Sequence, residues 1–333
     1  MVSKKNLLIL LLFIALPIVV SAAPLQYLTK VIETETAFES VSTNWNAGDD
    51  DTIQISIGFN FPFNGATYNQ VWINSNGMLS FSSSNTEYYN RQLPRTNESQ
   101  SIYPYWDDLY RRDGGTIKYD TLGTGDNEHL VIHWKRVRHY SRSGRYTFQV
   151  ILYKDGTIRF RYDSSSDADG TSYNGSDPGA TIGVQEDTSH YDQHSYNNVI
   201  DQTKDIVYYP LPDIQISKSS CVIQDPVNNT TNPKRIPGAT IRYAFQVSNT
   251  GAANADNVIV EDNLNTKFDH NTIKNLQIKN GSCDCLGVAS TSNNGANGTA
   301  NGVNPVKLDF GTVAAGSTGT PTVECGYFEV DIK

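Results

Sequence analysis

The stretch Gly58–Phe81, GFNFPFNGATYNQVWINSNGMLSF, carries the strongest fold signal in this sequence. Within 24 residues it combines a Pro-Phe turn, two strand-like runs and an Asn-Gly turn. An Asn-Gly turn between such runs is typical of a tight antiparallel hairpin. The large aromatic side chains of both runs are therefore predicted to lie in the interior of a β-sheet.

Strand signals continue on both sides of this stretch. Residues 52–61 alternate apolar and polar side chains, and Lys154-Asp155-Gly156 marks a further hairpin turn. Strands recur about every 8–12 residues, and no sustained helical period follows residue 22. The sequence therefore predicts an all-β fold built from sandwich domains.

Pro210-Leu211-Pro212 divides the chain, because proline fixes the backbone and cannot join a central strand. We predict two β-sandwich domains in tandem, residues 46–209 and 214–333, joined by a linker at 210–213. The second domain is expected to be immunoglobulin-like, since its roughly six or seven short strands suit that fold. Residues 23–45 form a lead-in segment with a weak apolar pattern.

The N-terminus has the pattern of a secretion signal. Lys4 and Lys5 precede the apolar run Leu7–Val20, and small residues follow it. The run of 14 residues is shorter than the roughly 20 of a membrane-spanning helix. We predict cleavage after Ala22, so that residues 1–22 are a signal peptide and the chain is secreted or at the cell surface without a transmembrane anchor.

The chain is acidic, with a formal net charge of −9 that becomes −11 when Lys4 and Lys5 leave with the signal. Such a surface repels nucleic acid, so no nucleic-acid partner is expected. The sequence contains no nucleophile–base motif, phosphate loop or dinucleotide fingerprint. The protein is predicted not to be an enzyme.

The four cysteines all lie in the last third of the chain: Cys221, Cys283, Cys285 and Cys325. An even number in an exported chain favours two disulfides, for which three pairings exist. A zinc site is the alternative, but the C-x-C spacing lacks the usual intervening residues and no histidine is near. Cys283 and Cys285 would share one face of a strand and are expected to reach different partners.

A series of short motifs runs through the second half of the chain. It comprises Ile216-Ser217-Lys218, residues 237–243, Ser248-Asn249-Thr250-Gly251, residues 255–258, Asp262-Asn263-Leu264 and residues 311–316. This series resembles the eleventh catalogued domain of unknown function, found in bacterial and archaeal surface proteins. Asn265 stands where that family commonly has proline. The resemblance implies a stalk-like, immunoglobulin-like module without known chemistry.

The first half carries Phe61-Pro62-Phe63-Asn64-Gly65, then Ser75-Asn76-Gly77 and Tyr105-Trp106-Asp107-Asp108. An apolar hairpin around Asp155-Gly156 follows. This succession is similar to a bacterial sandwich domain and, in architecture, to the nidogen-type extracellular domain. The resemblance implies an adhesion or matrix role and no catalysis.

Arginines on two neighbouring hairpins form the candidate binding surface. They are Arg136, Arg138, Arg142, Arg145, Arg159 and Arg161. Period-two geometry places Arg136 and Arg138 on one face, and Arg159 and Arg161 on one face. If these faces coincide, they form a cationic strip for an acidic polysaccharide or a neighbour's acidic edge. The alternative is a solvated face paired with local carboxylates.

Candidate metal ligands are oxygen-rich loops. Asp163, Asp167 and Asp169 form a loop that could hold Ca²⁺, and residues 49–51 are a second donor set. A solvated hairpin loop is the alternative for the first. His190 and His194 have the spacing of helical metal ligands, but their neighbours show no helical pattern, so loop histidines are expected.

Asp107 and Asp108 beside Trp106 could serve a glycoside hydrolase, in which two carboxylates flank one bond. Adjacent side chains usually point apart, however. A buried Trp106 beside a turn-capping aspartate is therefore the favoured interpretation.

The prediction is a secreted or cell-surface structural or adhesive protein, with a subunit of an extracellular filament or matrix as one variant. In that variant residues 24–40 would add as a strand to a neighbour's sheet. The expected partners are surface or matrix proteins, further copies of the chain, or acidic polysaccharide. The alternative is a carbohydrate-binding module with Ca²⁺ assistance, followed by a glycoside hydrolase.

Overall fold

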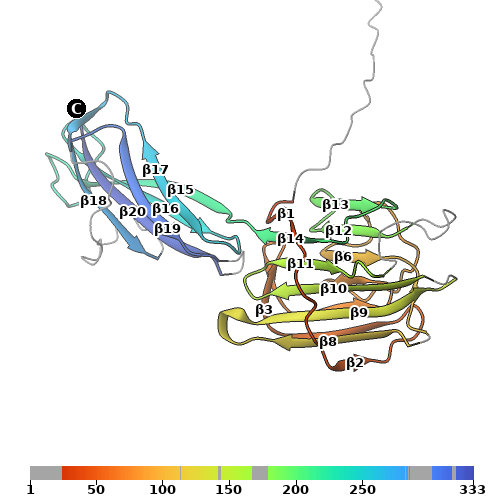
Figure 1. The fold of residues 1–333 in the computed structure, drawn as a ribbon. Coiled ribbons are helices and arrows are strands. Elements are labelled where there is room, and N and C mark those ends of the chain that lie inside the picture. Colours follow the sequence, from red (N-terminus) through yellow and green to blue (C-terminus); the bar gives the residue numbers. More distant parts are fainter. Residues whose placement is uncertain are drawn as a thin grey trace, which may run out of the picture.

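The computed structural model describes residues 25–112, 114–141, 144–166, 179–281, 283, 285, 302–316 and 320–333. Figure 1 shows two β-rich units joined where β14 (Lys204–Pro210) leads into β15 (Ile214–Gln224). The one helical element within these ranges is a single 3₁₀ turn, Gly125–Asn127. The predicted all-β fold is confirmed.

The first unit contains two antiparallel sheets. The eight-stranded sheet has the order β1-β14-β11-β10-β9-β8-β2, with β7 paired to β9. Its other strands are β1 (Leu28–Thr34), β2 (Thr43–Trp45), β7 (Leu109–Tyr110), β8 (Thr116–Leu122), β9 (His129–His139), β10 (Arg145–Tyr153) and β11 (Ile158–Tyr162). The six-stranded sheet has the order β13-β12-β6-β5-β4-β3. Its strands are β3 (Thr52–Phe63), β4 (Ala66–Asn74), β5 (Met78–Ser80), β6 (Ser101–Trp106), β12 (Thr181–Gln185) and β13 (Tyr191–Tyr196).

The core of this unit forms between the inner faces of the two sheets. On β3 every second residue from Ile55 to Phe63 is buried, while most residues between them remain exposed. From the facing sheet, Trp134 stacks on Phe148 with ring centroids 5.0 Å apart. Each large apolar side chain buried in this way contributes about 1.5–3 kcal/mol. The alternation seen in the sequence thus directs one face of β3 into the core.

The Ser75-Asn76-Gly77 turn between β4 and β5 is buried. Gly77 has φ +81°, and a Cβ atom at this position would lie 2.0 Å from the Tyr105 carbonyl oxygen. Asn76 accepts the Leu109 N–H on its side-chain oxygen at 2.8 Å and the Asp107 N–H on its carbonyl at 3.2 Å. Glycine is required here because only it combines positive φ with such close backbone approach. The turn therefore fixes the Trp106-Asp107-Asp108 segment in place.

The second unit contains a four-stranded sheet, in the order β15-β16-β20-β18, and a two-stranded sheet of β17 and β19. The strands are β16 (Thr240–Asn249), β17 (Ala255–Asp262), β18 (Phe268–Asn280), β19 (Val306–Val313) and β20 (Thr322–Ile332). Both sheets contribute to one core, in which Tyr243 and Phe245 of β16 pack near Phe328 of β20.

One disulfide, Cys283–Cys325, is closed in the second unit. It lies on the side of the four-stranded sheet that faces away from the core, near Ala244 and Tyr327. The second predicted bridge, which would join Cys221 to Cys285, is not closed in the structure. The prediction that Cys283 and Cys285 form bridges to different partners is therefore wrong for Cys285, because only Cys283 forms a disulfide.

The connection between the units is hydrogen-bonded to both. On one side the Leu211 N–H donates to the Tyr27 carbonyl at 2.7 Å. On the other side the Asp213 N–H donates to the Asn249 side-chain oxygen at 3.1 Å. Gly156 lies at the contact: a Cβ atom there would be 2.9 Å from Pro62 and 3.5 Å from Ala252. The backbone of the connecting segment is therefore hydrogen-bonded to both units.

Candidate functional site

Residues 35–42, which we term the crossing segment, connect β1 to β2 over the outer face of the eight-stranded sheet. Figure 1 shows this segment in red, running across the strands. Its hydrogen bonds meet five successive strands of the sheet, β14, β11, β10, β9 and β8. The partners are Asp205 for Thr36, Arg161 for Ala37, Gln149 and His129 for Glu39, and Asp120 for Ser42. The N-terminal lead-in is therefore built into the fold of its own chain.

Arg159 and Arg161 hold β1 and the crossing segment in place. Arg159 pairs with Glu33 and with Asp205, each at 2.8 Å. Arg161 lies 3.2 Å from Glu39 and 3.5 Å from Asp205, a carboxylate that is only 1% exposed. The two arginines share a face, as period-two geometry predicted. They do not form an exposed cationic strip, however, because Glu33, Glu39 and Asp205 neutralise them and the crossing segment lies against Arg161.

Of the other predicted arginines, Arg136, Arg138 and Arg145 lie on β9 and β10 rather than on β11. Arg138 of β9 faces Arg145 of β10 directly in the strand register. Arg136 is exposed and has φ +54°, next to the irregularity in register between Tyr146 and Phe148. Arg142 lies outside the described residues. A binding role for these arginines remains a prediction.

His133 lies beside the crossing segment, under the ring of Phe38 at 5.2 Å between centroids. Both residues line a groove of about 500 Å³ that also contains Lys135 and Asp163. Burial, together with the smaller effects of the Lys135 and Lys118 charges, lowers the pKa of His133 to about 4, against an opposing effect of Asp163. Its buried Nε2 has no hydrogen-bond partner. The folded protein therefore keeps this imidazole neutral.

This histidine should make stability depend on pH between 4 and 6.5. In that window the unfolded chain binds a proton that the folded chain does not, so the contribution is complete above pH 6.5 and is lost as the pH falls towards 4. The loss is roughly 3 kcal/mol. In urea unfolding at pH 4, 5, 6 and 7, His133→Phe should show a shallower pH dependence than the wild type. Equal slopes would exclude His133 as the source.

A second cluster of functional side chains lies at one end of the first unit. Its small cavity, of about 70 Å³, lies between three loops and is termed here the tyrosine-lined cavity. It is lined by Tyr88, Tyr89, Asn90, Asp107, Asp108, His139 and Ser141. Tyr88, Tyr89 and Asn90 come from the loop that follows β5, and the two aspartates come from the β6–β7 connection. His139 lies at the end of β9, and Ser141 lies in the turn after it.

The paired aspartates of this cluster have different surroundings. Asp107 is 5% exposed, accepts the Asp108 N–H at 2.9 Å, and lies 3.7 Å from His139. Trp106 is fully buried and donates its indole N–H to the Glu87 carbonyl at 3.2 Å. The prediction of a core tryptophan is confirmed, whereas the hydrogen bond from the Asp108 N–H to Asp107 reaches only the next residue.

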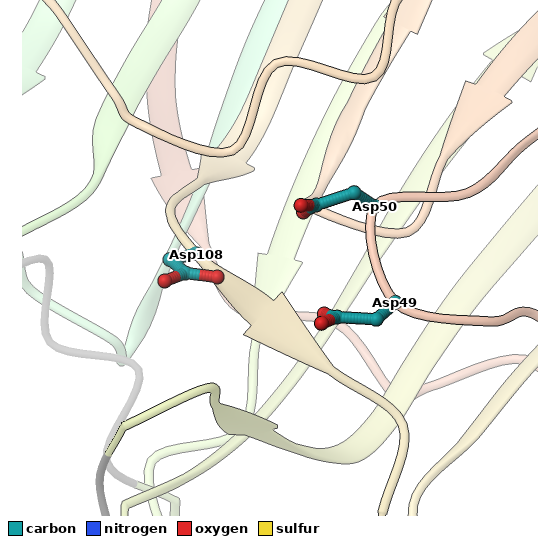
Figure 2. Close-up of side chains that lie close together, drawn as sticks. All are labelled: Asp49, Asp50 and Asp108. Atoms are coloured by element: carbon teal, nitrogen blue, oxygen red, sulfur yellow. The ribbon is translucent and has the colours of Figure 1, made fainter.

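Asp108 faces two carboxylates of a different loop. Figure 2 shows Asp49, Asp50 and Asp108 with their carboxylate groups turned towards one another. One oxygen from each lies within 4.8 Å of the others. Burial raises the pKa of Asp49, and the charge of Asp50 raises it further. This arrangement concentrates negative charge, and one oxygen from each carboxylate would supply three of the 6–8 oxygen ligands that Ca²⁺ takes.

The remaining predicted ligands do not form a metal site within the described residues. Asp163 accepts hydrogen bonds from the backbone N–H and hydroxyl of Ser165, as in a local turn, whereas Asp167 and Asp169 lie outside the described residues. His190 pairs with Asp187 at 2.9 Å. His194 lies within β13, so its predicted loop position is wrong. Calcium binding at Asp163 remains a prediction.

Two features of these sites were not predicted from the sequence. Tyr88 and Tyr89 form an adjacent aromatic pair within a polar segment, which is a usable signal for an exposed binding loop. Glu186 is fully buried and accepts the backbone N–H groups of Gln26 at 2.6 Å and Tyr27 at 3.0 Å. Burial raises the pKa of Glu186, partly offset by these hydrogen bonds. Its role as an anchor of the N-terminal segment has no local signature.

Comparison with known families supports the division into two parts. The model described as "NIDO related" matches residues 27–215, and that described as "Domain of unknown function (DUF7619)" matches residues 219–286. The resemblance of the second part to the eleventh domain of unknown function, and with it the immunoglobulin-like assignment, is not confirmed.

A comparison with curated proteins and the helix content of the structure add two findings. No curated protein matches this sequence. Across the described ranges, no helix has the length and apolar character needed to span a bilayer. The NIDO-related match covers more than half of the 333 residues. The chain therefore belongs to the NIDO-related family.

Proposed function

We propose that this protein is an extracellular structural or adhesive element that acts by binding and carries no catalytic activity. The observation that carries the proposal is the NIDO-related domain over residues 27–215, together with a disulfide in the part that follows. Disulfides persist in oxidising, extracytoplasmic compartments. Secretion through a signal peptide of residues 1–22 is part of the same proposal.

Two observations favour binding over catalysis. Asp107 and Asp108 both line the tyrosine-lined cavity, but the Asp107 carboxylate lies near His139 and the Asp108 carboxylate lies near Asp49 and Asp50. A glycoside hydrolase needs two carboxylates on either side of one bond. The connection between the two units is hydrogen-bonded on both sides, which suits a structural element.

The binding surface that we favour is the loop end of the first unit, around the tyrosine-lined cavity. We do not propose that residues 24–40 donate a strand to a neighbour. In the structure Leu28–Thr34 pairs over its whole length with β14 of the same chain, and the crossing segment continues this attachment. Release of this segment would break all of those contacts.

The proposal is tested by locating the protein and then by measuring adhesion. In cells that produce the full chain, the protein should be found in the medium or be removed by external protease, with a mature N-terminus at Ala23. Surfaces coated with the mature chain should retain these cells better than albumin-coated surfaces. A cytoplasmic protein that still carries residues 1–22, or retention no better than on albumin, would contradict the proposal.

A further inference from the structure

The exposed aromatic side chains of the described residues gather at one place. They are Tyr88, Tyr89 and Tyr140, exposed by 47%, 46% and 56%. The first two line the tyrosine-lined cavity, and Tyr140 stands between its lining residues His139 and Ser141. The other tyrosines in the described ranges are buried or only partly exposed. Exposed rings beside a cavity are the usual means of holding a ligand with an apolar face.

Asn90 adds an independent sign of a ligand. It lines the cavity and is only 1% exposed, yet its side-chain carbonyl oxygen has no hydrogen-bond partner. The orientation of the amide is fixed, because its nitrogen donates to the Gly179 carbonyl, to Thr181 at 3.3 Å and to Asn197 at 3.0 Å. A buried acceptor left without a donor costs about 1–3 kcal/mol. The site therefore lacks one donor, which a hydroxyl group would supply.

The size of the cavity limits what enters it. A volume of about 70 Å³ admits a hydroxyl or hydroxymethyl group, and is too small for a complete sugar ring. The ring of a saccharide would therefore lie outside, against Tyr88 and Tyr89, while one of its hydroxyl groups reaches Asn90. Arg91 packs over the Tyr89 ring, with its guanidinium carbon 5.3 Å from the ring centroid.

The negative charge around the cavity favours neutral over acidic saccharides. Asp107 and Asp108 line the cavity, and the carboxylates of Asp49 and Asp50 lie beside Asp108. Carboxylates accept hydrogen bonds from hydroxyl groups and repel uronic acids and sulfates. This surface is therefore unsuited to the acidic polysaccharides expected from the sequence.

We propose that the tyrosine-lined cavity binds a neutral saccharide of an extracellular polymer. A hydroxyl group donates to the Asn90 Oδ1 atom, and Tyr88 and Tyr89 pack against the apolar face of the sugar ring. The proposal rests on the adhesive function proposed above and names the ligand class of that function.

The experiment measures binding of the full mature chain to immobilised neutral glycans (glucans, mannans and galactans) and, in parallel, to uronic-acid and sulfated glycans. The wild type should bind at least one neutral glycan. The double variant Tyr88→Ala/Tyr89→Ala should lose about tenfold or more in affinity, equal to about 1.4 kcal/mol. Ile259→Ala, which removes a similarly exposed side chain from the second unit, should bind as the wild type does. Unchanged thermal unfolding of the double variant would show that the loss is local.

Three outcomes would overturn the saccharide proposal: no neutral glycan bound, acidic glycans alone bound, or equal binding by the double variant. The adhesion assay separates this failure from that of the proposed function. If the mature chain retains cells but binds no neutral glycan, the adhesive function stands and the ligand class is wrong. If it neither retains cells nor binds glycans, both proposals fail.

Discussion

Replacement of Asp205 by asparagine is expected to lower the free energy of unfolding by about 3 kcal/mol, at the lower end of the effect of breaking a buried ion pair. The Asp205 carboxylate is 1% exposed and lies 2.8 Å from Arg159 and 3.5 Å from Arg161. In the variant, the guanidinium groups of Arg159 and Arg161 remain in place, but the negative charge of Asp205 that compensates them is lost. Glu33 and Glu39 still contact them, which limits the loss.

The same substitution should loosen the crossing segment, since Thr36 donates to Asp205 at 2.7 Å. Urea unfolding measures the first effect, and the rate of limited proteolysis within residues 35–42 measures the second. Asp201→Asn is the matched control, because Asp201 is exposed and bonds only locally to Thr203. If Asp205→Asn unfolded at the same urea concentration as Asp201→Asn, the ion-pair network would have no part in holding the segment.

Replacement of Cys283 by serine should lower the stability of the second unit by about 4 kcal/mol. The bridge to Cys325 closes a loop with a sequence separation of 42, and its loss restores conformational entropy to the unfolded chain. The bridge connects the segment after β18 to β20, so its removal should also raise proteolysis of that segment. The measurement is unfolding by guanidinium under non-reducing conditions.

Two controls distinguish the effect of losing the disulfide bridge from the effect of replacing a cysteine side chain. Cys285→Ser should unfold as the wild type does, because Cys285 is not part of the Cys283–Cys325 bridge. With reductant present, the wild type should fall to the stability of Cys283→Ser. A wild type insensitive to reductant would show that the bridge contributes nothing to stability.

Local patterns predicted the sheets well. The alternation on β3 determined which of its side chains enter the core, and the Ser75-Asn76-Gly77 motif predicted the turn between β4 and β5. Both follow from the two-residue period of a strand and the backbone freedom of glycine, which act over a few residues. The buried position of that turn was not predictable, because it depends on contacts with Tyr105 and Leu109 of a distant segment.

The exposure of Arg159 and Arg161 could not be predicted from the local sequence. Period-two geometry placed Arg159 and Arg161 together, but their exposure depends on Glu33, Glu39 and Asp205, residues 44 to 126 positions away that the sheets bring to them. No local pattern shows that the crossing segment passes over that face.

By itself, the sequence determined the all-β class, the core face of β3 and a division near residue 210, since strand period and proline act on neighbouring residues. Only the tertiary structure selected the Cys283–Cys325 bridge and gathered Tyr88, Tyr89, Tyr140 and Asn90 around one cavity. These residues meet through strand order and loop packing. Such long-range contacts leave no period in the sequence, and the candidate binding site depends on them.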